Sequence, residues 1–132
     1  MPSSFNYELV IKEHHLDSYQ HVNNATYLSL YEEARWEVCT QRGLGYKKFH
    51  ELGQGPVILS VDLKFLKELS LREKINITFE VISYEKNIFK LKQQMLKEDG
   101  RVASEAIFTG AFFDMKARKI IPPSAEWLKV LY

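Results

Sequence analysis

The sequence has a single cysteine, Cys39, and no run of apolar residues long enough to cross a bilayer. One cysteine excludes an internal disulfide and a zinc site built from cysteines, and it favours a reducing compartment. The N-terminus also lacks a basic segment followed by an apolar one, so neither export nor membrane insertion is predicted. We therefore expect a cytoplasmic protein that does not associate with membranes.

The chain also lacks an excess of either charge. Its 18 lysines and arginines are almost cancelled by 17 aspartates and glutamates, which leaves a net charge of +1. Such a balance gives no field that would attract nucleic acid, so no nucleic-acid partner is expected. At 132 residues, without repeats or linkers, one domain spanning residues 1–132 is predicted.

The hydrophobic pattern changes from a period of two to a helical period early in the chain. Residues 5–11 alternate between apolar and polar, which indicates a half-buried strand. Residues 25–42 carry one apolar stripe and predict a long amphipathic helix, with Asn23 or Asn24 as its cap and Gly43 after its end. The stripe is predicted to consist of Leu28, Tyr31, Ala34 and Val38, with Tyr27 and Cys39 beside it.

The rest of the chain is predicted to be mainly β. Residues 43–56 are rich in glycine and predict an irregular connection. Four alternating segments follow and predict an antiparallel meander, after which Ser124 is a cap for a short C-terminal helix. The four segments are residues 57–66, 74–83, 88–96 and 101–114.

The fold class that follows is α+β. A five-stranded antiparallel sheet has one apolar face and the long helix has one apolar stripe, so each is buried against the other. The sheet keeps free edges, and joining two sheets through an edge would form a homodimer.

The segment "DSYQHVNN", residues 17–24, has more polar groups than a helix cap needs. Asp17 has a structural interpretation as a turn residue. However, a carboxylate beside the free amides of a helix N-terminus is also the minimum apparatus for acyl transfer. No G-x-S-x-G motif occurs, and Cys39 lies on the apolar stripe, where a thiol is inert. A lone carboxylate suits a thioester, because a thiolate leaves without protonation.

The longer segment "HHLDSYQHVNNATYLSLYEEAR" resembles the signature of hotdog-fold acyl-CoA thioesterases of the 4-hydroxybenzoyl-CoA thioesterase type. The order strand, helix, four strands is similar to that family over residues 5–114. The resemblance implies a hotdog fold, in which the sheet wraps around the long helix, with active sites at a dimer interface. It also implies that a coenzyme A thioester is hydrolysed, with water as the second substrate. No cofactor and no metal are expected.

Matched to that motif, Asp17 is implied to be the catalytic general base or nucleophile. The backbone amide of Asn24 is implied to bind the oxyanion. His21 matches by type, as a proton-transfer residue or as a group that shapes the loop. Asn23 and Tyr27 match by type as well and are candidate substrate contacts.

The acyl group is expected to enter between helix and sheet, beside Tyr27, Tyr31 and Trp36, although aromatic residues there are equally explained as core. Lys90 lies in a basic hairpin that also contains Lys86 and Lys92. A solvated strand face is the simpler explanation, and contact with coenzyme A phosphates is the second. Glu32 and Glu33 are expected to face solvent.

Three alternatives stay open. A hotdog module could bind an acyl thioester or a protein without turnover. A dehydratase could use His21 with Asp17 on carbons beyond the carbonyl. A metal site of His15, Asp17 and His21 is disfavoured, because no fourth ligand is evident. Whether dimers pair into tetramers is also open.

The sequence departs from the family pattern at several positions. Gln20 replaces the usual glycine before the histidine, which bears on the turn that aims Asp17. Glu68 and the pair Arg72 and Glu73 stand near positions where relatives often have proline and Gly-Asp.

Overall fold

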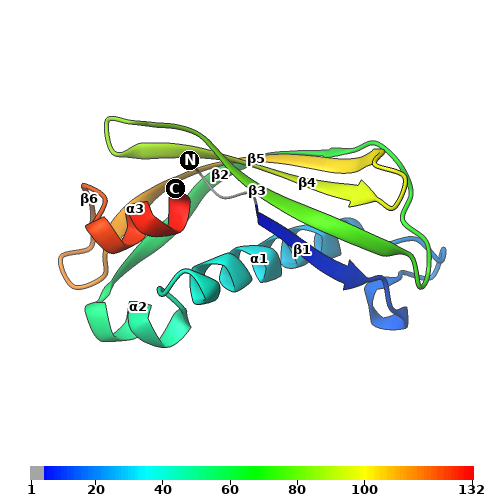
Figure 1. Cartoon of the computed structure of the whole chain (residues 1–132), viewed down its shortest axis with the longest axis horizontal. Helices are drawn as coiled ribbons and strands as arrows, with labels where there is room; N and C mark the ends of the chain where they lie inside the picture. Colours follow the sequence, from blue (N-terminus) through cyan, green and yellow to red (C-terminus); the bar gives the residue numbers. More distant parts are fainter. Residues whose placement is uncertain (1–4) are drawn as a thin grey trace.

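The computed structural model describes residues 5–132. Figure 1 shows one sheet with the long helix α1 beneath it, while α2, α3 and β6 gather at one end of the molecule. The strands are β1 (Phe5–Val10), β2 (Gln54–Phe65), β3 (Lys74–Glu85), β4 (Ile88–Lys97), β5 (Val102–Asp114) and β6 (Lys119–Ile121). The helices are the 3-10 turn η1 (Glu13–His15) and the α-helices α1 (Asn24–Gln41), α2 (Tyr46–Leu52) and α3 (Ala125–Leu131).

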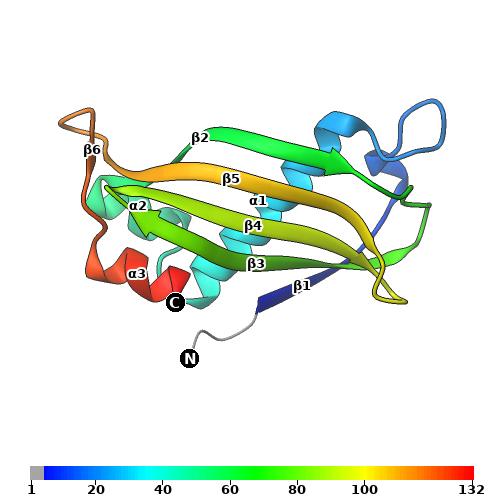
Figure 2. The same ribbon diagram turned by 90° about the horizontal axis from the view of Figure 1, so that it is seen from above.

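The sheet is antiparallel, with the order β1-β3-β4-β5-β2, and β6 adds a short strand against β5 (Figure 2). The predicted α+β hotdog architecture is confirmed, with β6 as a sixth strand that was not predicted. The predicted four-strand meander is wrong, because β2 pairs with β5 and not with β3. β3 is paired with β1 on one side and β4 on the other, so it has no free side for β2.

The core lies between the inner face of the sheet and one side of α1. Its helical part is made by Tyr27, Leu30, Tyr31, Ala34, Val38 and Cys39. Leu28 is 39% exposed, so its predicted place in the stripe is wrong, and Leu30 occupies the core instead. At about 100° per residue, Leu28 lies on the flank of a stripe centred on Ala34 and Val38.

Helix α2 replaces the irregular connection that was predicted for residues 43–56. Two of the four glycines that suggested an irregular connection stand at its ends: Gly45 precedes the helix, and Gly53 closes it with a φ of 67°. Between them Phe49 is buried and packs edge-on against Trp36, with ring centroids 5.4 Å apart. This contact stabilises a helix that is too short to be stable alone.

The C-terminal helix α3 begins as predicted, since the Ser124 hydroxyl accepts a hydrogen bond from the Trp127 amide at 3.1 Å. Trp127 is buried beside the inner face of the sheet and stacks on Phe112. Within residues 5–132, no helix has the length and apolar character needed to span a membrane.

Candidate active site

Asp17 holds a tight turn between η1 and α1. One of its carboxylate oxygens accepts hydrogen bonds from the amides of Tyr19 at 2.8 Å and His21 at 3.3 Å. Its backbone amide donates to the His21 carbonyl, and its carbonyl accepts from the Gln20 amide. The other carboxylate oxygen accepts no hydrogen bond from residues 5–132. The turn therefore fixes the carboxylate while leaving one oxygen available for chemistry.

Gln20 adopts a left-handed conformation in this turn, with a φ of 66°. Glycine takes that conformation without a steric penalty, whereas other residues pay about 1 kcal/mol or more. The departure from the family's usual glycine thus adds strain but keeps the backbone path of the turn.

The N-terminus of α1 follows directly. Asn23 is the cap: its side chain accepts a hydrogen bond from the Ala25 amide at 2.9 Å, and its carbonyl accepts one from the Thr26 amide. For the amide of Asn24, in contrast, residues 5–132 supply no acceptor. This amide lies at the positive end of the helix dipole and is available to a ligand oxygen.

His15 links the segment before the Asp17 turn to the cap of α1. Its ring Nδ1 accepts a hydrogen bond from the Lys12 amide at 2.9 Å, and its carbonyl accepts one from the Asn23 amide at 3.1 Å. Burial lowers the pKa of His15, with the neighbouring positive charge of His14 acting in the same direction. The folded protein therefore favours the neutral imidazole.

The lowered pKa of His15 predicts acid sensitivity. The neutral ring stabilises the fold above its unfolded pKa of about 6.5, and this contribution is lost as pH falls. We expect the urea midpoint of the wild type to fall between pH 7 and pH 5. In His15→Gln this fall should be smaller, whereas His50→Gln, at an exposed histidine on α2, should behave as the wild type. Equal slopes for all three proteins would contradict the prediction.

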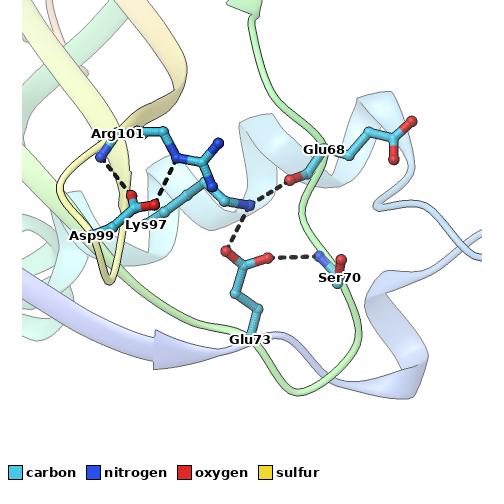
Figure 3. Close-up of polar contacts among 6 residues, drawn as sticks. All are labelled: Glu68, Ser70, Glu73, Lys97, Asp99 and Arg101. Atoms are coloured by element: carbon cyan, nitrogen blue, oxygen red, sulfur yellow. Dashed lines mark hydrogen bonds and ion pairs between the residues drawn. The ribbon is translucent and has the colours of Figure 1, made fainter.

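The connection between β2 and β3 lies near the Asp17 turn, since the Glu68 carboxylate is 3.5 Å from the His21 ring. Glu73 forms an ion pair with Lys97, with 2.7 Å between Oε2 and Nζ, and accepts a hydrogen bond from the Ser70 amide (Figure 3). Lys97 also donates to the backbone carbonyl of Glu68 at 2.8 Å. Lys97 and Glu73 are both mostly buried, so the pair fixes this connection to the end of β4.

The connection between β2 and β3 also forms hydrogen bonds with residues 11–13, which precede the Asp17 turn. The Arg72 guanidinium donates to both carboxylate oxygens of Glu13, and the Arg72 amide donates to the Ile11 carbonyl at 2.6 Å. Arg72 has a φ of 64°, a conformation that glycine adopts without a steric penalty, and the family resemblance implies a glycine near this position.

The remaining predicted site residues are spread more widely. The His21 ring lies 3.5 Å from the Glu68 carboxylate, and only its backbone contacts Asp17. Tyr27 is buried edge-on against Phe65, and burial raises its pKa.

Two further predicted contacts lie elsewhere. Tyr31 is fully buried and donates to the Ser104 hydroxyl at 2.8 Å, while burial raises its pKa. Lys90 is exposed and pairs across the sheet with Thr109, facing away from α1. The roles given to these residues stay predictions.

A cavity of about 420 Å³ lies at the other end of α1. Its walls come from the second half of α1, from α2, from the first part of β2, and from α3 with the inner face of the sheet. The apolar lining includes Trp36, Cys39, Phe49, Pro56, Ile58, Phe79, Phe89, Leu91, Met115 and Trp127. Its volume falls in the range of small-molecule pockets.

Only Trp36 of the three predicted acyl neighbours lines this cavity. Burial raises the pKa of the Cys39 thiol to about 12, which keeps it protonated and unreactive near neutral pH. Three acidic or basic side chains that were not predicted as site residues also face the cavity, Glu32, Arg35 and His50, together with the phenol of Tyr46. The signal for them was weak, because their charges resemble the polar face of any surface helix.

Comparison with known proteins identifies the family. Residues 11–131 match the model of the thioesterase-like superfamily. The chain is 27% identical over 121 residues to the long-chain acyl-CoA thioesterase FadM of Escherichia coli, covering 90% of each sequence.

Solved structures share the fold. A Staphylococcus aureus protein determined in complex with CoA has a TM-score of 0.89 at 20% identity, over 97% of this chain and 81% of that one. A 1,4-dihydroxy-2-naphthoyl-CoA thioesterase from Synechocystis has a TM-score of 0.87 at 14% identity, over 98% and 96%.

This chain belongs to the thioesterase-like superfamily, since the match covers almost its whole length. The resemblance to the hotdog-fold acyl-CoA thioesterases is thereby confirmed, and thioester hydrolysis is the reaction class that the family supports.

Proposed function

We propose that this protein hydrolyses the thioester bond of an acyl-CoA to a free acid and coenzyme A. The observation that carries the proposal is the turn before α1. One carboxylate oxygen of Asp17 and the backbone amide of Asn24 have no hydrogen-bond partner within residues 5–132, and both groups belong to the same hydrogen-bonded segment. The similarity to FadM, named as a long-chain acyl-CoA thioesterase, supports the substrate class.

The chemistry needs both groups. The amide of Asn24 donates to the carbonyl oxygen of the thioester, which stabilises the negative charge that develops there. Asp17 then acts in one of two ways. As a general base it takes a proton from water while the water oxygen attacks the carbonyl carbon. As a nucleophile it forms an anhydride, which water hydrolyses in a second step. In both routes the carbon–sulfur bond breaks and the thiolate leaves.

A second copy of the chain would complete the site. Within residues 5–132, strand β2 is an edge of the sheet, because β5 alone pairs with it, and β2 is long and carries exposed apolar side chains. Such an edge is a template for pairing with an identical edge. The exposed apolar residues on this edge are Ile58, Leu59, Val61 and Phe65. We therefore infer a homodimer formed by antiparallel pairing of two β2 strands.

This pairing accounts for the separation of the turn from the cavity. Helix α1 begins near the end of β2, where Tyr27 contacts Phe65, and its second half faces the start of β2, where Gly55 and Ile58 line the cavity with Trp36. Antiparallel pairing reverses the partner strand. The partner's catalytic turn is then beside the cavity of the first chain, and each site draws on both chains.

The dimer can be tested at Leu59, which lies near the middle of β2 and is 52% exposed. In Leu59→Lys, two like charges meet near the two-fold axis, so we expect a monomer and at least a tenfold loss of thiol release. Ile82→Lys is the matched control, since Ile82 is 51% exposed on β3, which is not an edge. Light scattering after gel filtration measures the mass. A Leu59→Lys dimer with full activity would contradict the inferred interface.

The reaction itself is tested by thiol release from a panel of short, long and aryl acyl-CoAs. Turnover of any member supports hydrolysis, and the preferred member identifies the acyl class. Ligand-dependent thermal stabilisation without thiol release would favour a non-catalytic binding module. Addition of water across an unsaturated acyl-CoA, without thiol release, would favour a hydratase. We place the reaction in the cytoplasm, as the single free cysteine predicts.

A further inference from the structure

The cavity wall contains a cation that the proposed mechanism does not use. Arg35 lies on α1, about 11 residues after Asn24 at the N-terminus of the helix, and its side chain lines the cavity. Burial lowers the pKa of Arg35, which is the effect of removing a charge from water. The rest of the lining is mainly aromatic and aliphatic, with Glu32, Tyr46 and His50 as its other polar side chains.

Arg35 is held in place by fully buried neighbours. Its Nη1 donates to the side-chain oxygen of Gln93 at 3.0 Å, and its Cζ lies 4.3 Å from the centroid of the Phe108 ring. Gln93 has no exposed surface, and its amide nitrogen donates to the Tyr31 carbonyl at 3.4 Å. The guanidinium is therefore positioned by the sheet and the helix together.

Most of the hydrogen-bonding capacity of Arg35 is unused. A guanidinium has five N–H donors, and one of them is accounted for by Gln93. Within residues 5–132, no carboxylate forms a salt bridge with Arg35. Glu32, one turn earlier on the helix, also lines the cavity, but it is exposed, is not paired with Arg35 and offsets the loss of solvation only in part. Placing a cation in such a wall costs stability unless an anion is bound there.

We propose that Arg35 binds a carboxylate carried by the acyl group, so that the preferred substrate has a free carboxylate in addition to its thioester. This inference rests on the proposed hydrolase function and narrows it to dicarboxylic acyl-CoAs. The planar fork of arginine suits a carboxylate, because two parallel N–H groups meet its two oxygens. The aromatic walls take the carbon chain between the thioester and that carboxylate.

The test compares adipoyl-CoA with hexanoyl-CoA, which have the same number of acyl carbons and differ in the terminal carboxylate. We expect the wild type to favour adipoyl-CoA in kcat/KM by about 10- to 100-fold, the range for one charge-assisted contact. Arg35→Met should lose this preference and hydrolyse hexanoyl-CoA at least as well as the wild type does. Arg35→Lys should be intermediate, because it keeps the charge but not the fork.

Lys48→Met is the matched control, since it also removes one positive charge but lies on the exposed side of α2. It should keep the wild-type preference for adipoyl-CoA. Circular dichroism of each variant checks that it is folded. If Arg35→Met does not fold, Arg35→Lys is used in its place to test the preference for adipoyl-CoA.

The outcomes separate this inference from the proposed function. If the wild type hydrolyses hexanoyl-CoA at least as well as adipoyl-CoA, the carboxylate site is wrong and the hydrolase stands. If no acyl-CoA is hydrolysed, the hydrolase is wrong. In that case, thermal stabilisation by adipate but not by hexanoate, lost in Arg35→Met, would still support the anion site, and its absence would overturn it.

Discussion

Replacing Asp17 with asparagine should lower kcat for acyl-CoA hydrolysis by about 10²- to 10⁴-fold, which is the usual contribution of a general base. Asparagine has the same shape, and its side-chain oxygen can accept the two amide hydrogen bonds that Asp17 accepts from Tyr19 and His21. The turn should therefore persist while the negative charge is lost. Thiol release under saturating substrate measures the effect, and the free energy of unfolding should change by less than about 1 kcal/mol.

The control for this substitution is Asp99→Asn. Asp99 also accepts a backbone amide, that of Arg101 at 2.9 Å, in the turn between β4 and β5 (Figure 3). Asp99 lies outside the turn between η1 and α1, so losing its charge should leave kcat unchanged. If Asp17→Asn keeps the wild-type kcat, Asp17 is only a turn residue, and the mechanism proposed above is wrong.

The largest effect on stability is expected at Gly110 on β5. A Cβ atom there would lie 2.4 Å from Cζ of Phe89 and 2.7 Å from the backbone oxygen of Val57. Both distances are far inside van der Waals contact, and the backbone of β2 cannot move without breaking its pairing with β5. Gly110→Ala should therefore lower the free energy of unfolding by about 2 to 4 kcal/mol, measured by urea denaturation.

Gly55→Ala is the matched control for Gly110→Ala. A Cβ at Gly55 would lie 3.2 Å from Cδ1 of Phe49, and this nearest atom belongs to a side chain on the short helix α2 that can shift. The expected cost is below about 1.5 kcal/mol. Similar urea midpoints for Gly110→Ala and the wild type would show that the close approach of β2, Phe89 and Gly110 is absent in solution.

Much of the fold could be predicted because local patterns report burial directly. The helical period over residues 25–42 and the alternation in the strands follow from which side chains face the core. The error at Leu28 arose because the sequence gives the existence of a stripe but not its centre. That centre is set by how α1 crosses the sheet, which buries Leu30 instead.

The errors of topology have a different origin. Helix α2 is only seven residues long and depends on the contact of Phe49 with Trp36, a residue of another helix. The pairing of β2 with β5 joins segments about 50 residues apart, and no local pattern specifies such a partner. Short helices and strand order are decided by tertiary contacts.

The candidate site also has one part that the sequence predicts and another that depends on tertiary contacts. The sequence by itself determined the family and the residues of the turn, because Asp17, Asn23 and Asn24 act through contacts within a few positions of the chain. Only the tertiary structure decided the cavity, since α1, α2, α3 and the sheet each supply part of its wall. The N–H groups of Arg35 that have no acceptor within residues 5–132 also became evident only in the tertiary structure. Chemistry made by neighbours in sequence can be read locally, whereas a binding pocket exists only once distant elements pack together.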